Sequence, residues 1–273
     1  MKLNRRQRVI IGLVLSVLFL ALICVFGILS TEEARVTEFS RKNLAPCAEY
    51  LFGTDWLGRD MLARTLKGLS ISILIGVLAA GVSALIALVL GIVAATMGKT
   101  VDAVITFVID LIMGVPHILL LILISVAVGK GLKGVIVGVA LSHWPSLARL
   151  IRAEVIQLKE SPYIQIAEKL GKSKWYIARK HMLPHLLPQF IVGLVLLFPH
   201  AILHESSITF LGFGLSAEQP AIGIVLSEAM KYLITGKWWL ALFPGVMLVL
   251  TVVLFEMAGT SLRKLLDPSS AHR

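Results

Sequence analysis

Long uncharged runs of apolar residues recur along the chain, separated by short polar segments. The first run, at 9–29, carries no charge, and the second, at 69–98, extends over 30 residues without one. A bilayer core about 30 Å thick needs roughly 20 apolar residues in helical form, so each run can cross a membrane. Soluble proteins with buried helices rarely repeat such runs. The pattern predicts an all-α membrane protein with six transmembrane helices, at 9–29, 69–98, 101–129, 134–158, 186–203 and 238–259.

Charge distribution predicts how these helices are oriented. Apolar residues make up 57% of the sequence, charged residues only 15%, and the mean hydropathy is +0.88. The segment 158–185 contains six Lys and Arg residues but only two Glu, whereas 30–68 contains six basic and six acidic residues. Because cytoplasmic loops carry the excess of Lys and Arg, we expect both termini and 158–185 in the cytoplasm. The net charge of +10 is then a topology signal, and no nucleic-acid partner is expected.

Two segments can be distinguished on this pattern. Residues 1–68 would comprise an N-terminal cytoplasmic tail, the first transmembrane helix and an outer-face loop. Residues 69–273 would form the core transmembrane domain, with a cytoplasmic loop at 158–185 and a short outer helix at 222–234. The first run is longer than the apolar core of a signal peptide, which is roughly 7–15 residues, so we expect a retained helix.

The outer-face loop ends in a compact polar motif. Two glycines supply backbone freedom for a turn, and Asp55, Arg59 and Asp60 can pair to fix it. Nothing in this motif resembles a catalytic site, and we interpret it as structural. Its residues are Gly53, Asp55, Gly58, Arg59, Asp60 and Arg64.

The basic segment 158–185 predicts two short helices joined by a turn. Ser161-Pro162 is a helix start signal, Gly171 ends that helix, and a second helix is expected at 174–182, running to Pro184. An amphipathic helix pair between two membrane spans either docks on another protein or lies on the lipid surface. The residues alone leave both alternatives open.

Two short matches to a phosphate-binding loop are false. Gly-Lys-Thr at 98–100 and Gly-Lys-Ser at 171–173 resemble its end, but Val93 and Ile166 occupy the positions where the motif needs its first glycine. No nucleotide site is therefore visible, and no cofactor is expected on this chain.

Polar and titratable residues inside apolar runs are expensive and suggest function. We expect Asp110 to pair across helices, and Arg149 and Arg152 to reach the membrane surface or anchor the cytoplasmic loop. His200 and His204 lie one helical turn apart and, with the adjacent Glu205, could ligate a transition metal, although interhelical packing is the alternative. His117 follows Pro116 within the third run. The candidate pathway residues are Asp110, His143, His200, His204 and Glu205.

Taken together, these motifs resemble the dipeptide/oligopeptide/nickel permease family of ABC importers, specifically the second of its two permease subunits. The resemblance covers nearly the whole chain. It rests on the outer-face motif, on the segment 142–188, on Ser-Ile-Thr-Phe-Leu-Gly-Phe-Gly at 207–214 and on Leu266-Asp267-Pro268.

The resemblance implies a type I ABC importer permease fold and a cytoplasmic coupling loop that inserts into an ATPase cleft. The family pattern in that loop is Glu-Ala-Ala, three residues, then Gly; here Gln165 and Ile166 depart from it, while Ala167 and Gly171 fit. The residues expected to couple to the ATPase are Tyr163, Gln165, Ala167, Glu168, Gly171, His181 and Pro184.

The implied partners are a second permease subunit, two cytoplasmic ATPases that carry ATP and Mg, an outer substrate-binding protein and membrane lipid. The chain would be a non-catalytic, multi-pass protein of the inner membrane, working by alternating access. Ser142-His143-Trp144 and His204 favour nickel-type over peptide-type members. The alternatives are a peptide-only importer, an intramembrane enzyme and a stand-alone secondary transporter. No convincing catalytic motif and no internal repeat support the last two.

Overall fold

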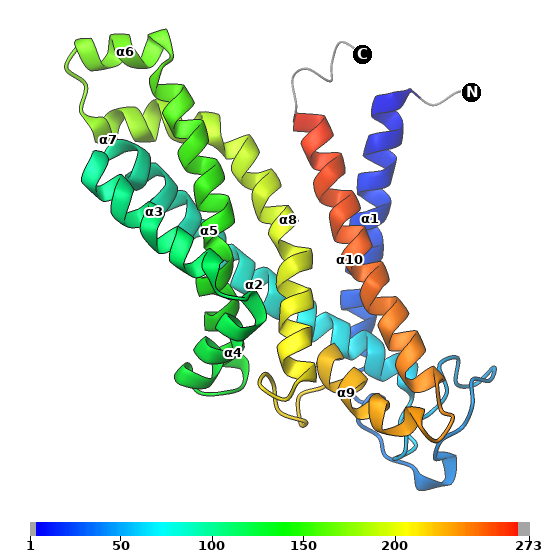
Figure 1. Cartoon of the computed structure of the whole chain (residues 1–273). Helices are drawn as coiled ribbons and strands as arrows, with labels where there is room; N and C mark the ends of the chain where they lie inside the picture. Colours follow the sequence, from blue (N-terminus) through cyan, green and yellow to red (C-terminus); the bar gives the residue numbers. More distant parts are fainter. Residues whose placement is uncertain (1–3, 267–273) are drawn as a thin grey trace.

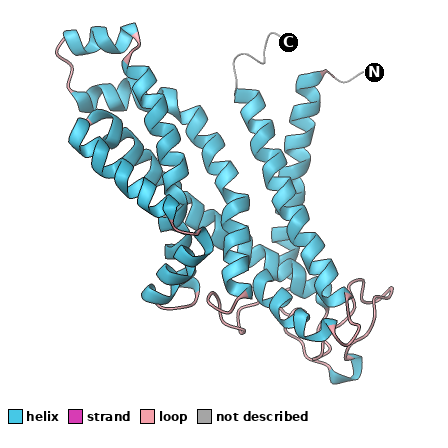
Figure 2. Ribbon diagram, in the orientation of Figure 1, coloured by secondary structure: helices cyan, strands magenta, loops and turns pink. Residues whose placement is uncertain are grey.

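The computed structural model describes residues 4–266, and within that range every regular element is a helix (Figures 1 and 2). Five helices are long and apolar enough to cross a membrane, or six spans if one bent pair counts as a span. The all-α class is therefore as predicted. The elements are α1 (Arg5–Leu29), η1 (Phe39–Arg41), α2 (Met61–Thr96), α3 (Lys99–Gly114), α4 (His117–Val128), α5 (Leu132–Lys159), α6 (Pro162–Lys169), α7 (Lys174–Ile177), η2 (Ala178–Met182), α8 (Leu183–Phe210), α9 (Ile222–Leu233) and α10 (Trp239–Leu266).

The third predicted span, 101–129, is broken in the middle. It consists of α3 and α4, which are bent by 101° relative to each other. Pro116 explains the break, because proline lacks the amide hydrogen that a helix needs and disfavours helical geometry in the residue before it. Val115 accordingly has φ −89° and ψ 136°. The structure thus corrects the continuous helix that the apolar run predicted.

The second short helix of the cytoplasmic segment does not end before Pro184. It continues as α7 through the π-helical turn η2 into α8, so that one stretch runs from Lys174 to Phe210. Pro184 and Pro188 remove two amide hydrogens near this junction, and a wider π-turn is one way to absorb such a loss. A displacement of this segment would therefore be transmitted directly along α8.

α2 is the central helix of the fold. It packs against α1, α5, α8 and α9, and Ala79, Ala80, Ala84 and Ala87 on it are fully buried. Small side chains let helices approach closely in membranes, where packing drives their association. α1 and α10 lie together on one side of α2. The start of α1 and the end of α10 lie at the same end of the molecule as α6 (Figure 1).

Large apolar side chains cover much of the outer surface. Leu29, Phe107 and Leu123 are 71%, 66% and 64% exposed in the isolated chain. Contiguous apolar surface of this kind marks contact with lipid or with another protein. The exposed surface therefore agrees with a protein that lies in a bilayer.

The predicted division at residue 68 falls inside α2, so 1–68 and 69–273 are sequence segments that share one helix. The short outer helix predicted at 222–234 is α9. Of the motif at 266–268, Asp267 and Pro268 lie outside the described residues.

Gly91 is expected to set the distance between α2 and α5. A Cβ at this position would lie 2.9 Å from the Ala148 carbonyl oxygen and 2.9 Å from Ile151 Cβ. Gly91→Ala should therefore lower the free energy of unfolding by about 1–3 kcal/mol, the usual effect of overpacking. Denaturant unfolding of the purified protein in detergent measures this. Gly81→Ala is the matched control on the same helix, because a Cβ there meets no described atom within 4 Å. Equal losses in both variants would contradict the prediction.

Candidate functional site

Asp55 lies at the centre of a buried ion-pair network. The segment between α1 and α2 that carries it lies at the end of the molecule opposite α6 (Figure 1). Its Oδ2 accepts hydrogen bonds from Arg59 Nε at 2.6 Å and from Arg64 Nη1 at 2.5 Å. Its Oδ1 accepts hydrogen bonds from the amides of Leu57 at 2.8 Å and Arg59 at 3.0 Å. Four donors thus satisfy a carboxylate that is removed from solvent, as a buried charge requires.

Glu228 of α9 completes this network, and the sequence did not single it out. Arg64 Nη2 lies 2.7 Å and Arg59 Nη2 3.7 Å from Glu228 Oε2. The Trp56 ring stacks on Tyr232 with centroids 4.7 Å apart, and both guanidinium groups lie over it, at 5.3 and 5.6 Å. The loop before α2 is thereby attached to both α2 and α9. The signal that could have found Glu228 is that it is the one carboxylate in α9.

Asp60 does not join these ion pairs, which corrects the predicted pairing. It is the N-cap of α2, where its Oδ1 accepts a hydrogen bond from the Leu62 amide at 2.8 Å. Burial raises the pKa of the Asp60 carboxyl, and hydrogen bonds from the backbone oppose that shift. The predicted turn glycines, Gly53 and Gly58, have φ 71° and 76°. A Cβ on Gly58 would meet the Glu38 carbonyl oxygen, so that turn requires glycine.

The segment 158–185 contains the end of α5, α6, a left-handed turn, α7, η2 and the first residues of α8, and is called the α6–α7 loop below. Pro162 opens α6, and Gly171 follows its end with φ 73°. Ile164 and Ala167 are buried on its inner side, at 0% and 8% exposure. Ala167, predicted to contact an ATPase, therefore packs within the chain. Its burial helps to hold α6 in place, and its contact with an ATPase stays a prediction.

The remaining predicted coupling residues lie at or near the surface of the α6–α7 loop. Tyr163, Gln165, Glu168, Gly171 and Pro184 are exposed. The Gln165 amide nitrogen also donates a hydrogen bond to a backbone carbonyl at the end of α5, at 3.2 Å.

His181 is half-buried, and its ring lies between two tyrosines. The ring centroids are 6.1 Å from Tyr163 and 5.9 Å from Tyr176. His181 therefore connects α6 with the stretch that continues into α8.

Three large apolar side chains project from the outer face of the α6–α7 loop. Ile166, Leu170 and Trp175 are 57%, 72% and 75% exposed, although the segment is otherwise rich in charge. Large exposed apolar side chains can mark a docking site, and tryptophan is prominent among the residues that dominate binding energy. The sequence singled out none of the three as contacts, since family resemblance directed attention to the Ala and Gly positions.

Two ion pairs connect α3 to α5 within the apolar region. Arg149 Nη2 donates to Asp110 Oδ1 at 2.6 Å, and Arg152 Nη2 donates to Asp102 Oδ2 at 2.6 Å. Asp110 thus has a partner on another helix, and both arginines pair instead of anchoring the loop. The Arg149 and Asp110 side chains are 51% and 60% exposed. Charged residues within membrane spans usually face a water-filled cavity or another helix, so this face of α3 and α5 is a candidate for such contact.

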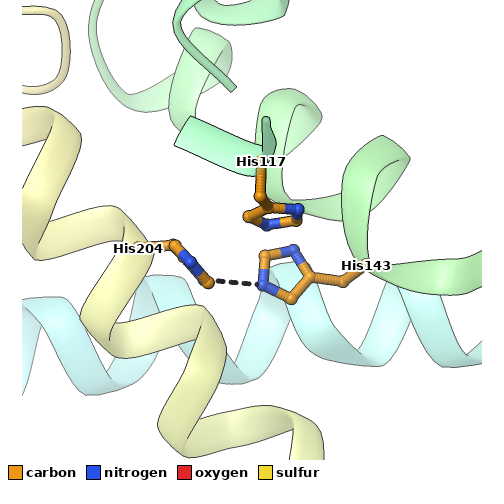
Figure 3. Close-up of side chains that lie close together, drawn as sticks. All are labelled: His117, His143 and His204. Atoms are coloured by element: carbon orange, nitrogen blue, oxygen red, sulfur yellow. Dashed lines mark hydrogen bonds between the residues drawn. The ribbon is translucent and has the colours of Figure 1, made fainter. Parts of the chain in front are cut away.

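Three histidines from three helices converge in the interior (Figure 3). His117 opens α4, His143 lies within α5 and His204 within α8. One ring nitrogen from each lies within 4.8 Å of those of the other two. His143 Nε2 and His204 Nδ1 are 3.0 Å apart, and His143 Nδ1 is 2.9 Å from the Val139 carbonyl oxygen. His143 is 7% exposed, and the other two are half-buried.

The predicted grouping of His200, His204 and Glu205 is corrected by this arrangement. His204 lies with His117 and His143, while His200, one turn earlier on α8, is exposed. Glu205 is fully buried and is not part of the histidine group. Its carboxylate accepts hydrogen bonds from the hydroxyl groups of Ser206 at 3.2 Å and Thr209 at 3.0 Å. His200 and Glu205 therefore do not join His204 in one site.

Sequence comparison relates the chain to transport proteins. Residues 87–272 match the model of a family described as binding-protein-dependent transport system inner membrane component. The dipeptide transport system permease protein DppC of Bacillus subtilis is 34% identical over 268 residues, which cover 98% of this chain and 83% of that protein. The oligopeptide transport system permease protein OppC of the same organism is 30% identical, with 98% and 88% covered.

Structural comparison supports the same fold. A chain from the crystal structure of the MetNI methionine ABC transporter in inward facing conformations superimposes with a TM-score of 0.62. The match covers 76% of this chain and 98% of that one at 18% sequence identity. At this identity the likeness concerns the fold alone.

Proposed function

We propose a transport mechanism for this chain, which belongs to the family of binding-protein-dependent transport system inner membrane components and is a permease subunit of an ABC importer. It is a multi-pass protein of the inner membrane. The family consists of non-catalytic permease components, and membership implies a permease partner and ATPases. In our proposal the chain forms one half of the pore, and ATP and Mg are bound by the ATPases only.

The apolar surface on the α6–α7 loop is the observation that carries the proposal. Leu170 and Trp175 are more than two-thirds exposed. α6 and α7 lie at the same end of the molecule as the start of α1 and the end of α10 (Figure 1). We assign this end to the cytoplasm and this surface to an ATPase. Because α7 continues into α8, movement of the docked loop would reorient a helix that carries His204.

The half-exposed Asp110–Arg149 pair supports the position of the pore. Charged side chains that face away from the interior of the chain, at membrane depth, are stable beside water or a protein partner. We therefore place the second permease subunit and the pathway along α3, α4 and α5. ATP binding and hydrolysis would bias this assembly between inward-open and outward-open states.

The cargo we propose is a di- or oligopeptide, delivered by an outer binding protein. The two Bacillus subtilis relatives are named for dipeptide and oligopeptide transport. Nickel or a metal chelate, which the sequence favoured, finds no support in those names. The convergence of His117, His143 and His204 is the specific observation that keeps a metal-containing cargo as a second candidate.

Co-purification and uptake test the proposal. A tagged chain isolated from its native membrane should bring down an ATPase and a second permease subunit. Reconstituted with its binding protein, the complex should import labelled di- and oligopeptides only when ATP is supplied inside. A chain that never brings down an ATPase, or that transports without ATP, would contradict it. Uptake of nickel chelates without peptide uptake would replace the first cargo with the second.

A further inference from the structure

The three converging histidines have the composition of a metal site. We infer that His117, His143 and His204 bind a divalent late first-row transition metal ion, such as Ni²⁺, Co²⁺ or Zn²⁺, where α4, α5 and α8 meet (Figure 3). Imidazole nitrogens suit these ions, whereas Mg²⁺ and Ca²⁺ prefer oxygen ligands, and none of the three grouped residues offers a carboxylate. Three histidines with an open fourth position are also a known tetrahedral arrangement.

His143 is oriented as a metal ligand normally is. Its Nδ1 lies 2.9 Å from the Val139 carbonyl oxygen, which can only accept, so Nδ1 carries the proton and Nε2 has the free lone pair. The Ser142 hydroxyl lies 3.0 Å from the same nitrogen. Metal-bound histidines almost always donate their second N–H to a carbonyl, carboxylate or water, which fixes the tautomer. The His143 lone pair therefore points toward His204.

The spacing of the nitrogens fits an ion between them. In a tetrahedral site with bonds of about 2.0–2.1 Å, ligand nitrogens lie about 3.3–3.4 Å apart. His143 Nε2 and His204 Nδ1 are 3.0 Å apart, close to that value, and share one hydrogen. Because His143 Nε2 has no hydrogen, the shared hydrogen is on His204 Nδ1. An ion would take its place, and the hydrogen would then be carried by His204 Nε2, the other tautomer of that ring. The His204 ring stays neutral and no proton is released.

His117 supplies the third nitrogen. Its Nε2 is shielded from solvent and has no hydrogen-bond partner among the described residues. A buried polar atom left without a partner costs about 1–3 kcal/mol, which a bound ion would offset. The ring centroid of His117 lies 4.5 Å from that of His143 and 4.3 Å from that of His204. One of its ring nitrogens lies within 4.8 Å of theirs, so binding of an ion would draw that nitrogen inward.

The site can be reached from outside the helix bundle. An open cavity of about 470 Å³ is lined by residues 112–117, which form the bend between α3 and α4, and by Ser142. A solvent molecule or a donor atom of the cargo can therefore occupy the fourth ligand position. Binding of the ion at this site does not depend on the proposed function. Its further movement as cargo does. As cargo, the ion would pass through a site made of helices that move during transport.

Cobalt binding to the purified transporter tests this inference. Co²⁺ titrated into the whole complex in nanodiscs should bind once per copy of this chain and give the visible bands of a tetrahedral ion. His117→Gln, His143→Gln and His204→Gln should each weaken binding by more than about 100-fold, since loss of an outer-sphere partner alone costs about 10- to 100-fold. His185→Gln is the matched control, because His185 is an exposed histidine on the same helix as His204. That variant should bind like the unchanged chain.

The outcomes separate the metal site from the transport proposal. Absence of tetrahedral Co²⁺, or binding that all three variants retain, would overturn the site whatever the complex transports. Peptide-driven ATP hydrolysis in the same preparations reports on folding and on permease function independently. If His143→Gln does not assemble, the half-buried His117 and His204 still decide the matter. If the unchanged complex binds Co²⁺ at this site but does not transport peptide, the result counts against the proposed function and not against the metal site.

Discussion

Gly171→Asn is expected to reduce ATP-driven transport about 10- to 100-fold while the protein remains folded in the membrane. Gly171 has φ 73°, which asparagine tolerates better than other side chains, and a Cβ there meets none of the described atoms within 4 Å. The chain itself thus has room for the substitution. An ATPase docked closely on the turn does not, and overpacking an interface costs about 1–3 kcal/mol, where 1.4 kcal/mol is tenfold.

Basal ATP hydrolysis should persist in this variant, because the ATPase sites lie on other subunits. The measurement is therefore the ratio of substrate transported to ATP hydrolysed in proteoliposomes. Gly236→Asn is the matched control, with φ 79°, an exposed position and equally open surroundings, between α9 and α10 at the opposite end of the molecule. Normal coupling in Gly171→Asn, or an equal loss in Gly236→Asn, would show that no partner docks at this turn.

Apolar runs predicted the spans well, because burying about 20 residues in a bilayer is a local property of the sequence. α1, α5 and α8 contain the predicted runs 9–29, 134–158 and 186–203 and extend beyond them by a few residues. α2 ends two residues before the end of its predicted run, α10 begins one residue after the start of its own, and both continue several residues past the other end. The extensions are polar or mixed turns that hydrophobicity alone assigns to loops. The bend at Pro116 was not predicted, although the proline was visible in the sequence. The apolar run continues through it, and hydrophobicity does not show whether a helix changes direction.

Contacts between distant positions could not be predicted from spacing. His117, His143 and His204 come together only because α4, α5 and α8 converge, and the sequence could pair only His200 with His204, one turn apart. The same reason hid Glu228, which lies 164 positions from Arg64 and is hydrogen-bonded to it at 2.7 Å. Local geometry was more accessible, and the turn at Asp55 and Arg59 follows directly from residues four apart.

The two faces of α6 illustrate a further limit. Its periodicity predicts one buried and one exposed side, but only the fold shows that Ile164 and Ala167 face inward. Ile166, which replaces an alanine of the family pattern, is 57% exposed. The departure thus adds to the exposed apolar surface of α6 and leaves its buried face unchanged.

Asp55→Ala is expected to lower the free energy of unfolding by about 3–5 kcal/mol, the usual effect of removing one partner from a buried ion pair. Asp55 is fully buried and neutralises two guanidinium groups, and Arg64 is only 2% exposed. Without the carboxylate, Arg64 keeps Glu228 as its one described ion-pair partner. The amides of Leu57 and Arg59 also lose their acceptor, so the turn before α2 loses its geometry.

The buried location, and not the ion pair as such, should produce this effect. Glu38→Ala provides the control, because Glu38 pairs with Arg41 at 3.1 Å in the same loop while both side chains are more than 40% exposed. Exposed pairs contribute about 0–1 kcal/mol, so that variant should unfold almost like the unchanged chain. Denaturant unfolding in detergent, followed by the fluorescence of Trp56 and its neighbours, measures both. Equal stability of the two variants would mean that water reaches Asp55 and that the network does not hold the loop against α2 and α9.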